Sequence, residues 1–67
     1  MRVDIIDRII PHYLLGHGPM SIDQIVHVVK SLVPGALEYE VRNSMQRLTL
    51  LQLISTVPDG RWVAVQP

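Results

Sequence analysis

The chain has 67 residues, in which six Lys and Arg side chains balance six Asp and Glu side chains, and it contains no cysteine. A chain of this length forms one small domain whose core contributes about 3–5 kcal/mol, and disulfides and thiolate metal sites are excluded. Uncharged apolar runs are far shorter than the ~20 residues of a membrane span. Asp4 and Asp7 also interrupt the stretch that a signal peptide would keep uncharged. We therefore expect a single globular domain located in the cytoplasm.

Apolar residues recur every three or four positions over residues 3–15, which predicts the first helix. The stripe consists of Val3, Ile6, Ile10 and Leu14. Ile5 and Ile9 widen it beyond what a small core needs, so they are left over for a partner. Pro11 lies inside the pattern and predicts a kink or a restart, because it lacks a backbone donor and clashes with the preceding turn.

The second helix is predicted over residues 22–33. Ser21 and Gln24 have the spacing of a capping box, in which each side chain satisfies a backbone N–H of the first turn. Its apolar face consists of Ile22, Ile25, Val26, Val29 and Leu32. Pro34 and Gly35 end the pattern.

The third helix is predicted over residues 37–51, and the period then changes to that of a strand. Its apolar face consists of Leu37, Val41, Met45 and Leu48, and Val28 and Leu50 fall outside the core faces. Two strands within residues 53–66 are joined by Pro58-Asp59-Gly60, which has the residue types of a tight turn. Because an isolated hairpin is marginal in water, we expect Trp62 to anchor it to the helices, and Pro19-Met20 to form a further short strand.

This order, mostly α with a small β-hairpin, resembles a winged helix-turn-helix domain that covers residues 1–67. The resemblance is carried by Val41, Met45 and Leu48 followed by Gln52-Leu53-Ile54, in the register of small bacterial and phage repressors. In that family a glycine usually closes the recognition helix, and here Gln52 stands in its place. Either the helix ends differently, or a non-glycine residue tolerates the left-handed conformation at a cost of about 1–2 kcal/mol.

The resemblance implies that the third helix reads the major groove of DNA and that the hairpin is the wing. The side chains suited to base or phosphate contact are Tyr39, Arg42, Asn43, Gln46, Arg47 and Arg61. Charge divides in the same direction, since residues 1–40 carry a net charge of −2 and residues 41–67 a net charge of +2. The same residue types also suit a solvated helix face, on which Glu38 and Arg42 would form an ordinary surface ion pair.

A protein-interaction module is the alternative, with Ile5, Ile9 and Leu50 as its contact residues. Leu50 lies in line with Asn43 and Gln46, where it suits either a thymine methyl group or a protein surface. A homodimer through the first helix would use the same surplus of apolar residues and double the DNA contacts.

We expect no enzymatic activity, no cofactor and no metal, because phosphate-binding loops and nucleophile–base pairs are missing from the sequence. The three histidines, His12, His17 and His27, do not share one helical face, so they are interpreted as loop and surface residues.

Overall fold

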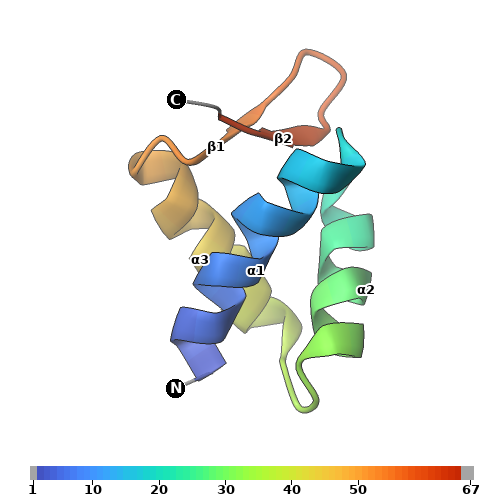
Figure 1. Ribbon diagram of the computed structural model, residues 1–67, viewed down its shortest axis with the longest axis vertical. Coiled ribbons are helices and arrows are strands. Elements are labelled where there is room, and N and C mark those ends of the chain that lie inside the picture. The colour runs from blue at the N-terminus through green and yellow to red at the C-terminus, as the bar shows by residue number, and fades with distance from the viewer. Residues whose placement is uncertain (1, 66–67) are drawn as a thin grey trace.

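The computed structural model describes residues 2–65, with residue 2 described by its backbone alone. Three helices precede an antiparallel hairpin, in the predicted order: α1 (Arg2–His17), α2 (Ile22–Leu32), α3 (Glu38–Leu50), β1 (Ile54–Thr56) and β2 (Trp62–Ala64). The helices pack on one another, and the hairpin lies across the end of the bundle where α1 and α3 finish and α2 begins (Figure 1). The predicted fold class is confirmed, whereas the hairpin strands are shorter than the range 53–66, of which residue 66 lies outside the described residues.

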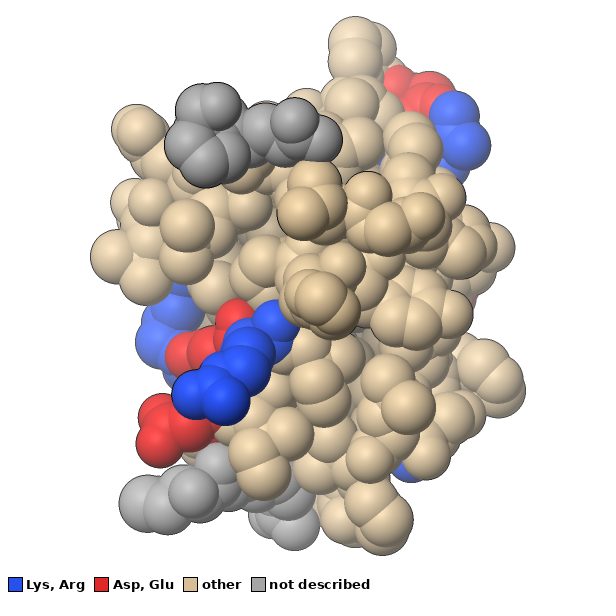
Figure 2. Space-filling view, viewed as in Figure 1, with Lys and Arg blue, Asp and Glu red and all other residues tan. Residues whose placement is uncertain are grey.

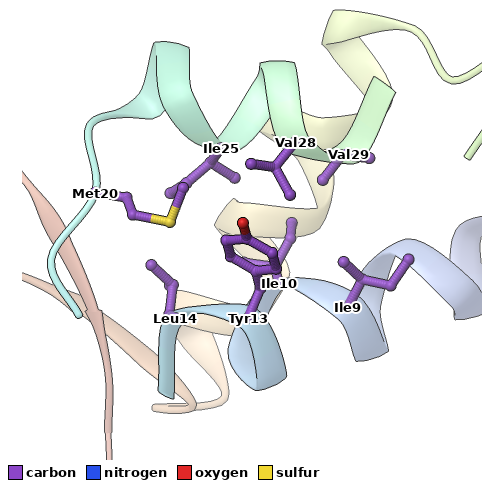
Figure 3. A pocket seen from close by; sticks show the side chains of 8 residues that line it. All are labelled: Ile9, Ile10, Tyr13, Leu14, Met20, Ile25, Val28 and Val29. Carbon is purple, nitrogen blue, oxygen red and sulfur yellow. The ribbon is translucent and has the colours of Figure 1, made fainter. Parts of the chain in front are cut away.

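The core consists of buried aliphatic side chains from the three helices, their connections and β1. Its members are Ile6, Ile10, Leu14, Met20, Ile25, Val26, Val29, Val33, Ala36, Val41, Met45, Leu48 and Ile54. Figure 3 shows the contact between α1 and α2, where the Tyr13 ring extends from α1 towards Val28 on α2. The cavity left between α1 and α2 holds only about 10 Å³, which is too small for a ligand, so this contact between the two helices is structural.

The core corrects the sequence prediction mainly at the ends of the apolar stripes. Val3, Leu32 and Leu37 were expected to be buried but are exposed, since they lie at helix ends beyond the reach of a neighbouring helix. Conversely, Ile9 and Val28 were expected to be surplus, yet both are half-buried against the core. The contact between α1 and α2 therefore includes residues beyond the apolar stripes predicted for the two helices.

Helix α1 does not restart at Pro11, contrary to one of the predicted alternatives. The buried side chains of Ile6 and Ile10 precede the proline and that of Leu14 follows it, all on the face that packs against the core. This shared burial holds both halves of the helix in one register although the proline lacks a backbone donor.

Local side-chain bonds set where the other helices begin. The predicted capping box is confirmed: the Gln24 backbone N–H donates to Ser21 Oγ at 3.2 Å, and Gln24 Oε1 accepts from the Ser21 N–H at 2.9 Å. At α3, Glu40 Oε1 accepts from the Leu37 N–H at 2.9 Å, so the helix begins at residue 38. In both helices, a Gln or Glu side chain of the first turn satisfies the backbone N–H of the residue just before the helix.

The hairpin is tied to the helices through Trp62, as predicted. Its register pairs Ile54 with Ala64, and the turn places Gly60 at a φ of 88°. Trp62 also exchanges two backbone hydrogen bonds with Met20, at 2.7 and 3.0 Å, and its ring is half-buried against the core. The segment before α2 thus forms an isolated bridge beside β2.

Gln52 occupies the left-handed position that closes α3, with a φ of 62°, and it is the sole non-glycine residue at positive φ within residues 2–65. The Leu53 N–H donates to the Leu48 carbonyl at 2.9 Å, and the Gln52 N–H to the Thr49 carbonyl at 3.0 Å. These two bonds form a Schellman motif, the helix ending in which glycine is preferred. Of the two predicted alternatives, the helix therefore ends in the left-handed conformation, and Gln52 carries the strain.

Substituting Gln52→Gly is expected to stabilise the domain by about 0.5–1 kcal/mol. Relief of about 1–2 kcal/mol of backbone strain exceeds the added flexibility of glycine in the unfolded chain. Urea unfolding at an unchanged m-value measures the effect. The control is Leu51→Gly at a φ of −82°, where the same substitution relieves no strain and should destabilise. An unchanged or lower free energy of unfolding for Gln52→Gly would contradict the strain assigned to this residue.

Candidate nucleic-acid interface

Helix α3 presents one face to the core and the opposite face to solvent. The buried side chains are Val41, Ser44, Met45 and Leu48. At 3.6 residues per turn, the side chains pointing away from this stripe are Tyr39, Asn43, Gln46 and Leu50, which we call the outer face. All four are exposed, and Leu50 is the most exposed large apolar residue within residues 2–65, at 79%. The sequence correctly placed Asn43, Gln46 and Leu50 in line on one side of the helix, whereas Arg42, grouped with them in the sequence prediction, lies at the flank of this face.

A shallow groove runs along one flank of the outer face. It encloses about 330 Å³ and is lined by Ile22, Arg42, Met45, Gln46, Thr49, Leu50 and Trp62. These residues come from the start of α2, from α3 and from β2, so the helix pair and the hairpin meet around one surface. The bridge between Met20 and Trp62 fixes the hairpin's place in it.

Arg42, at the groove flank, forms the ordinary surface pair that the sequence also allowed. Its Nε donates to Glu38 Oε2 at 2.8 Å, one helical turn earlier, and both side chains are about half exposed. Such an exposed pair contributes about 0–1 kcal/mol, so a phosphate or a base can compete for the guanidinium.

Arg47 lies on the opposite flank, facing α1. Its guanidinium donates to the two carboxylate oxygens of Asp7 at 2.9 and 3.3 Å, and the Ser44 hydroxyl donates to the same carboxylate. Partial burial would raise the pKa of Asp7, but the hydrogen bonds from Arg47 and Ser44 and the charge of Arg47 outweigh it and lower the pKa. Arg47 thus joins α3 to α1.

Asp7 and Ser44 are structural partners that the sequence did not predict. Ser44 lies three residues after Val41 and four before Leu48, which places a hydroxyl in the buried stripe of α3. A buried hydroxyl needs a hydrogen-bond partner, so this position was the available signal. Its partner could not be identified, because Asp7 lies on another helix 37 residues away.

Arg61 follows the hairpin turn and is paired within the turn. It donates to Asp59 Oδ2 from Nε at 2.7 Å, and its backbone N–H donates to Asp59 Oδ1 at 3.1 Å. The side-chain hydrogen bond from Arg61 is the main cause of a lowered pKa of Asp59. All three arginines of the predicted interface therefore face a carboxylate of the same chain.

A second, apolar groove lies between α1 and the hairpin and encloses about 570 Å³. It is lined by Arg8, Pro11, His12, Leu15, Leu53, Ala64 and Val65. Figure 2 shows that the face over α1 and the hairpin carries few charges, which gather at one edge and at the hairpin tip. We call this surface the apolar groove; it was not predicted from the sequence, because Leu53 and Val65 join Leu15 only in the fold.

The structure does not gather the three predicted partner-binding residues at one surface. Leu50 lines the groove beside α3, whereas neither Ile5 nor Ile9 does. Ile5 is half exposed on α1, and Ile9 packs against the core.

The histidines and acidic residues of the described chain are dispersed. Within residues 2–65, no three His, Asp or Glu side chains are grouped so that they could hold a metal ion. His17 instead stacks on Tyr13, with ring centroids 5.8 Å apart. In the same range, no helix combines the length and apolar character needed to cross a membrane.

Comparison of the chain with protein-family models, curated proteins and solved structures gives no match. The fold and the geometry of α3 and the hairpin are accordingly the basis for a functional assignment.

Proposed function

We propose that the protein binds double-stranded DNA sequence-specifically, as a small transcriptional regulator that inserts α3 into the major groove and uses the hairpin as a wing. The observation that supports this most directly is the outer face of α3, which takes no part in the core. The side chains of Asn43 and Gln46 have no hydrogen-bond partner among residues 2–65, so their amides are free for a ligand. Amide side chains hydrogen-bond base edges in the major groove, and the exposed Tyr39 hydroxyl suits a phosphate oxygen.

Electrostatics limit the affinity of a single copy. The net charge is zero, and Arg42, Arg47 and Arg61 are each paired with a carboxylate. A monomer therefore gains little from phosphate contacts and binds weakly. Two copies joined through α1 would double the contacts and match a palindromic site, so the proposal includes a homodimer.

Fluorescence anisotropy of labelled duplex fragments from the source genome, at about 50 and 200 mM salt, tests the proposal. We expect binding at the lower concentration that weakens steeply at the higher one. Absence of binding at 50 mM salt, with protein well into the micromolar range, would contradict DNA binding.

Substitutions on α3 and on the wing should act differently. Gln46→Ala should relax sequence preference at one position of the site, at a cost of about 1–3 kcal/mol for the preferred duplex. Arg42→Ala or Arg61→Ala should weaken all duplexes alike and reduce the salt slope by about one. Lys30→Ala is the control, because Lys30 lies in the last turn of α2. Equal affinities for all three variants and the wild type would remove these assignments.

A protein-interaction module is the second candidate, and the apolar groove favours it. Leu15, Leu53 and Val65 are exposed around that groove, on a face with few charges (Figure 2). If DNA fails to bind, sedimentation of the protein alone is the next measurement. Self-association that Leu53→Asp abolishes would identify the groove as an interface between two copies of the chain.

A further inference from the structure

We propose that the outer face of α3 reads A·T base pairs, with Asn43 and Gln46 on adenine and Leu50 on a thymine methyl group. This inference rests on the proposed DNA binding and specifies its target. It follows from which side chains point directly outwards and which are held at the flanks.

The two arginines of α3, whose guanidinium groups are suited to guanine, are both turned away from the centre of the face. Arg42 is held on the groove flank by Glu38, and Arg47 on the α1 flank by Asp7. A guanidinium reads guanine through two hydrogen bonds to O6 and N7, and each of these arginines already donates to a carboxylate. Glu38 would also bring negative charge towards the guanine acceptors if Arg42 moved to the centre.

The centre of the face holds groups with the opposite preference. An Asn or Gln amide both donates and accepts, which matches N7 and N6 of adenine, and an exposed methyl-bearing side chain matches the C5 methyl group of thymine. The amides of Asn43 and Gln46 are unpartnered among the described residues, and Leu50 is 79% exposed in line with them. Leu50 is not part of the core, so its side chain is available for a contact outside the domain.

The spacing of these three residues fits successive base pairs. Leu50 lies seven positions after Asn43, about 10 Å further along the helix, which is about three base-pair steps of B-form DNA. We therefore expect a short block of three or four A·T pairs at the centre of each half-site.

The experiment selects binding duplexes from a library of random sequence at about 50 mM salt and then modifies the selected site. A·T blocks should be enriched. Replacing thymine by uracil, which removes only the C5 methyl group, should weaken wild-type binding about fourfold per contacted methyl. Leu50→Ala should bind the thymine and uracil duplexes equally. Leu51→Ala, which removes an exposed leucine at the helix end, should keep the wild-type preference.

Replacing adenine by 7-deazaadenine, which removes N7, should weaken wild-type binding about fivefold or more and should not affect the matching Asn43 or Gln46 alanine variant.

Each other outcome overturns the inference in a distinguishable way. Enrichment of G·C blocks would leave DNA binding intact and remove the A·T assignment. A·T blocks that bind equally well with uracil and 7-deazaadenine would place the readout outside the major groove, and so outside α3. No enrichment and no binding at 50 mM salt would overturn the proposed function together with this inference. Circular dichroism of Leu50→Ala ensures that its loss of discrimination is not a loss of fold.

Discussion

The double variant Glu38→Gln, Asp59→Asn is expected to bind DNA about 100-fold more tightly than the wild type at 50 mM salt. It removes the carboxylates that compete with phosphates for Arg42 and Arg61, and so raises the net charge of the proposed interface by two. Each added unit of positive charge at the phosphates adds about 0.9 to the slope of log affinity against log salt concentration, so the slope should steepen by about two. The amide oxygen that replaces the Asp59 carboxylate can still accept from the Arg61 N–H, which preserves the turn.

A matched control separates local pairing from total charge. Asp4→Asn, Asp23→Asn also gives a net charge of +2, but these aspartates lie on α1 and α2. If the interface is formed by α3 and the hairpin, this control should gain much less affinity. An equal gain for both double variants would mean that net charge alone sets the affinity, and a gain in neither would contradict the proposed interface.

Substituting Asp7→Ala should destabilise the domain by about 2 kcal/mol and lower the Tm by about 10 °C. The Ser44 hydroxyl is fully buried and donates to Asp7, so the substitution leaves it without that acceptor, at a cost of about 1–3 kcal/mol. In a domain of this size, each kcal/mol corresponds to about 4–8 °C. Thermal and urea unfolding measure both quantities.

The double variant Asp7→Ala, Ser44→Ala provides the internal control. Removing both partners of a buried hydrogen bond is nearly neutral, so the double variant should recover much of the lost stability. Asp4→Ala, one turn earlier on the same helix, should be close to neutral because Asp4 is exposed. A double variant as unstable as the sum of its two single variants would contradict the coupling.

The Asp7 carboxylate also predicts how the stability of the domain depends on pH. The pKa of Asp7 is lower in the folded protein than its usual value of 3.8, so the ionised carboxylate stabilises the fold above that value. This contribution should be constant from about pH 5 to 7 and be lost as the pH falls through the folded-state pKa. The stability difference between the wild type and Asp7→Asn should therefore shrink below about pH 4. A stability difference that grew on acidification would contradict the lowered pKa of Asp7 in the folded protein.

Features encoded by neighbouring residues were predictable from the sequence. The capping box of Ser21 and Gln24, the turn at Pro58-Asp59-Gly60 and the pair of Glu38 with Arg42 involve residues within four positions of one another. Short-range geometry allows few alternatives for such pairs. The element order and the exposed side of α3 follow from the same local periodicity.

Features that depend on helix packing were not predictable in the same way. The sequence identified Arg47 only as a DNA contact, and its bond to Asp7 depends on how α1 crosses α3. The burial of Ile9 and the exposure of Leu37 likewise depend on how far the neighbouring helix extends. Periodicity locates the apolar side of a helix, whereas the partner determines how much of that side is covered.

The two hydrogen bonds between Met20 and Trp62 join segments that are 42 positions apart in the chain, and they divide the hairpin into a base and a tip. The base is bonded to the connection between α1 and α2, and the helices on either side of that connection pack against α3. Beyond the base, the tip from Val57 to Arg61 is held mainly by bonds within its own turn. In the proposed DNA complex, the tip could therefore reorient over the phosphate backbone while α3 keeps its place in the groove. The strength of phosphate contact at the hairpin and base reading at α3 would then vary independently.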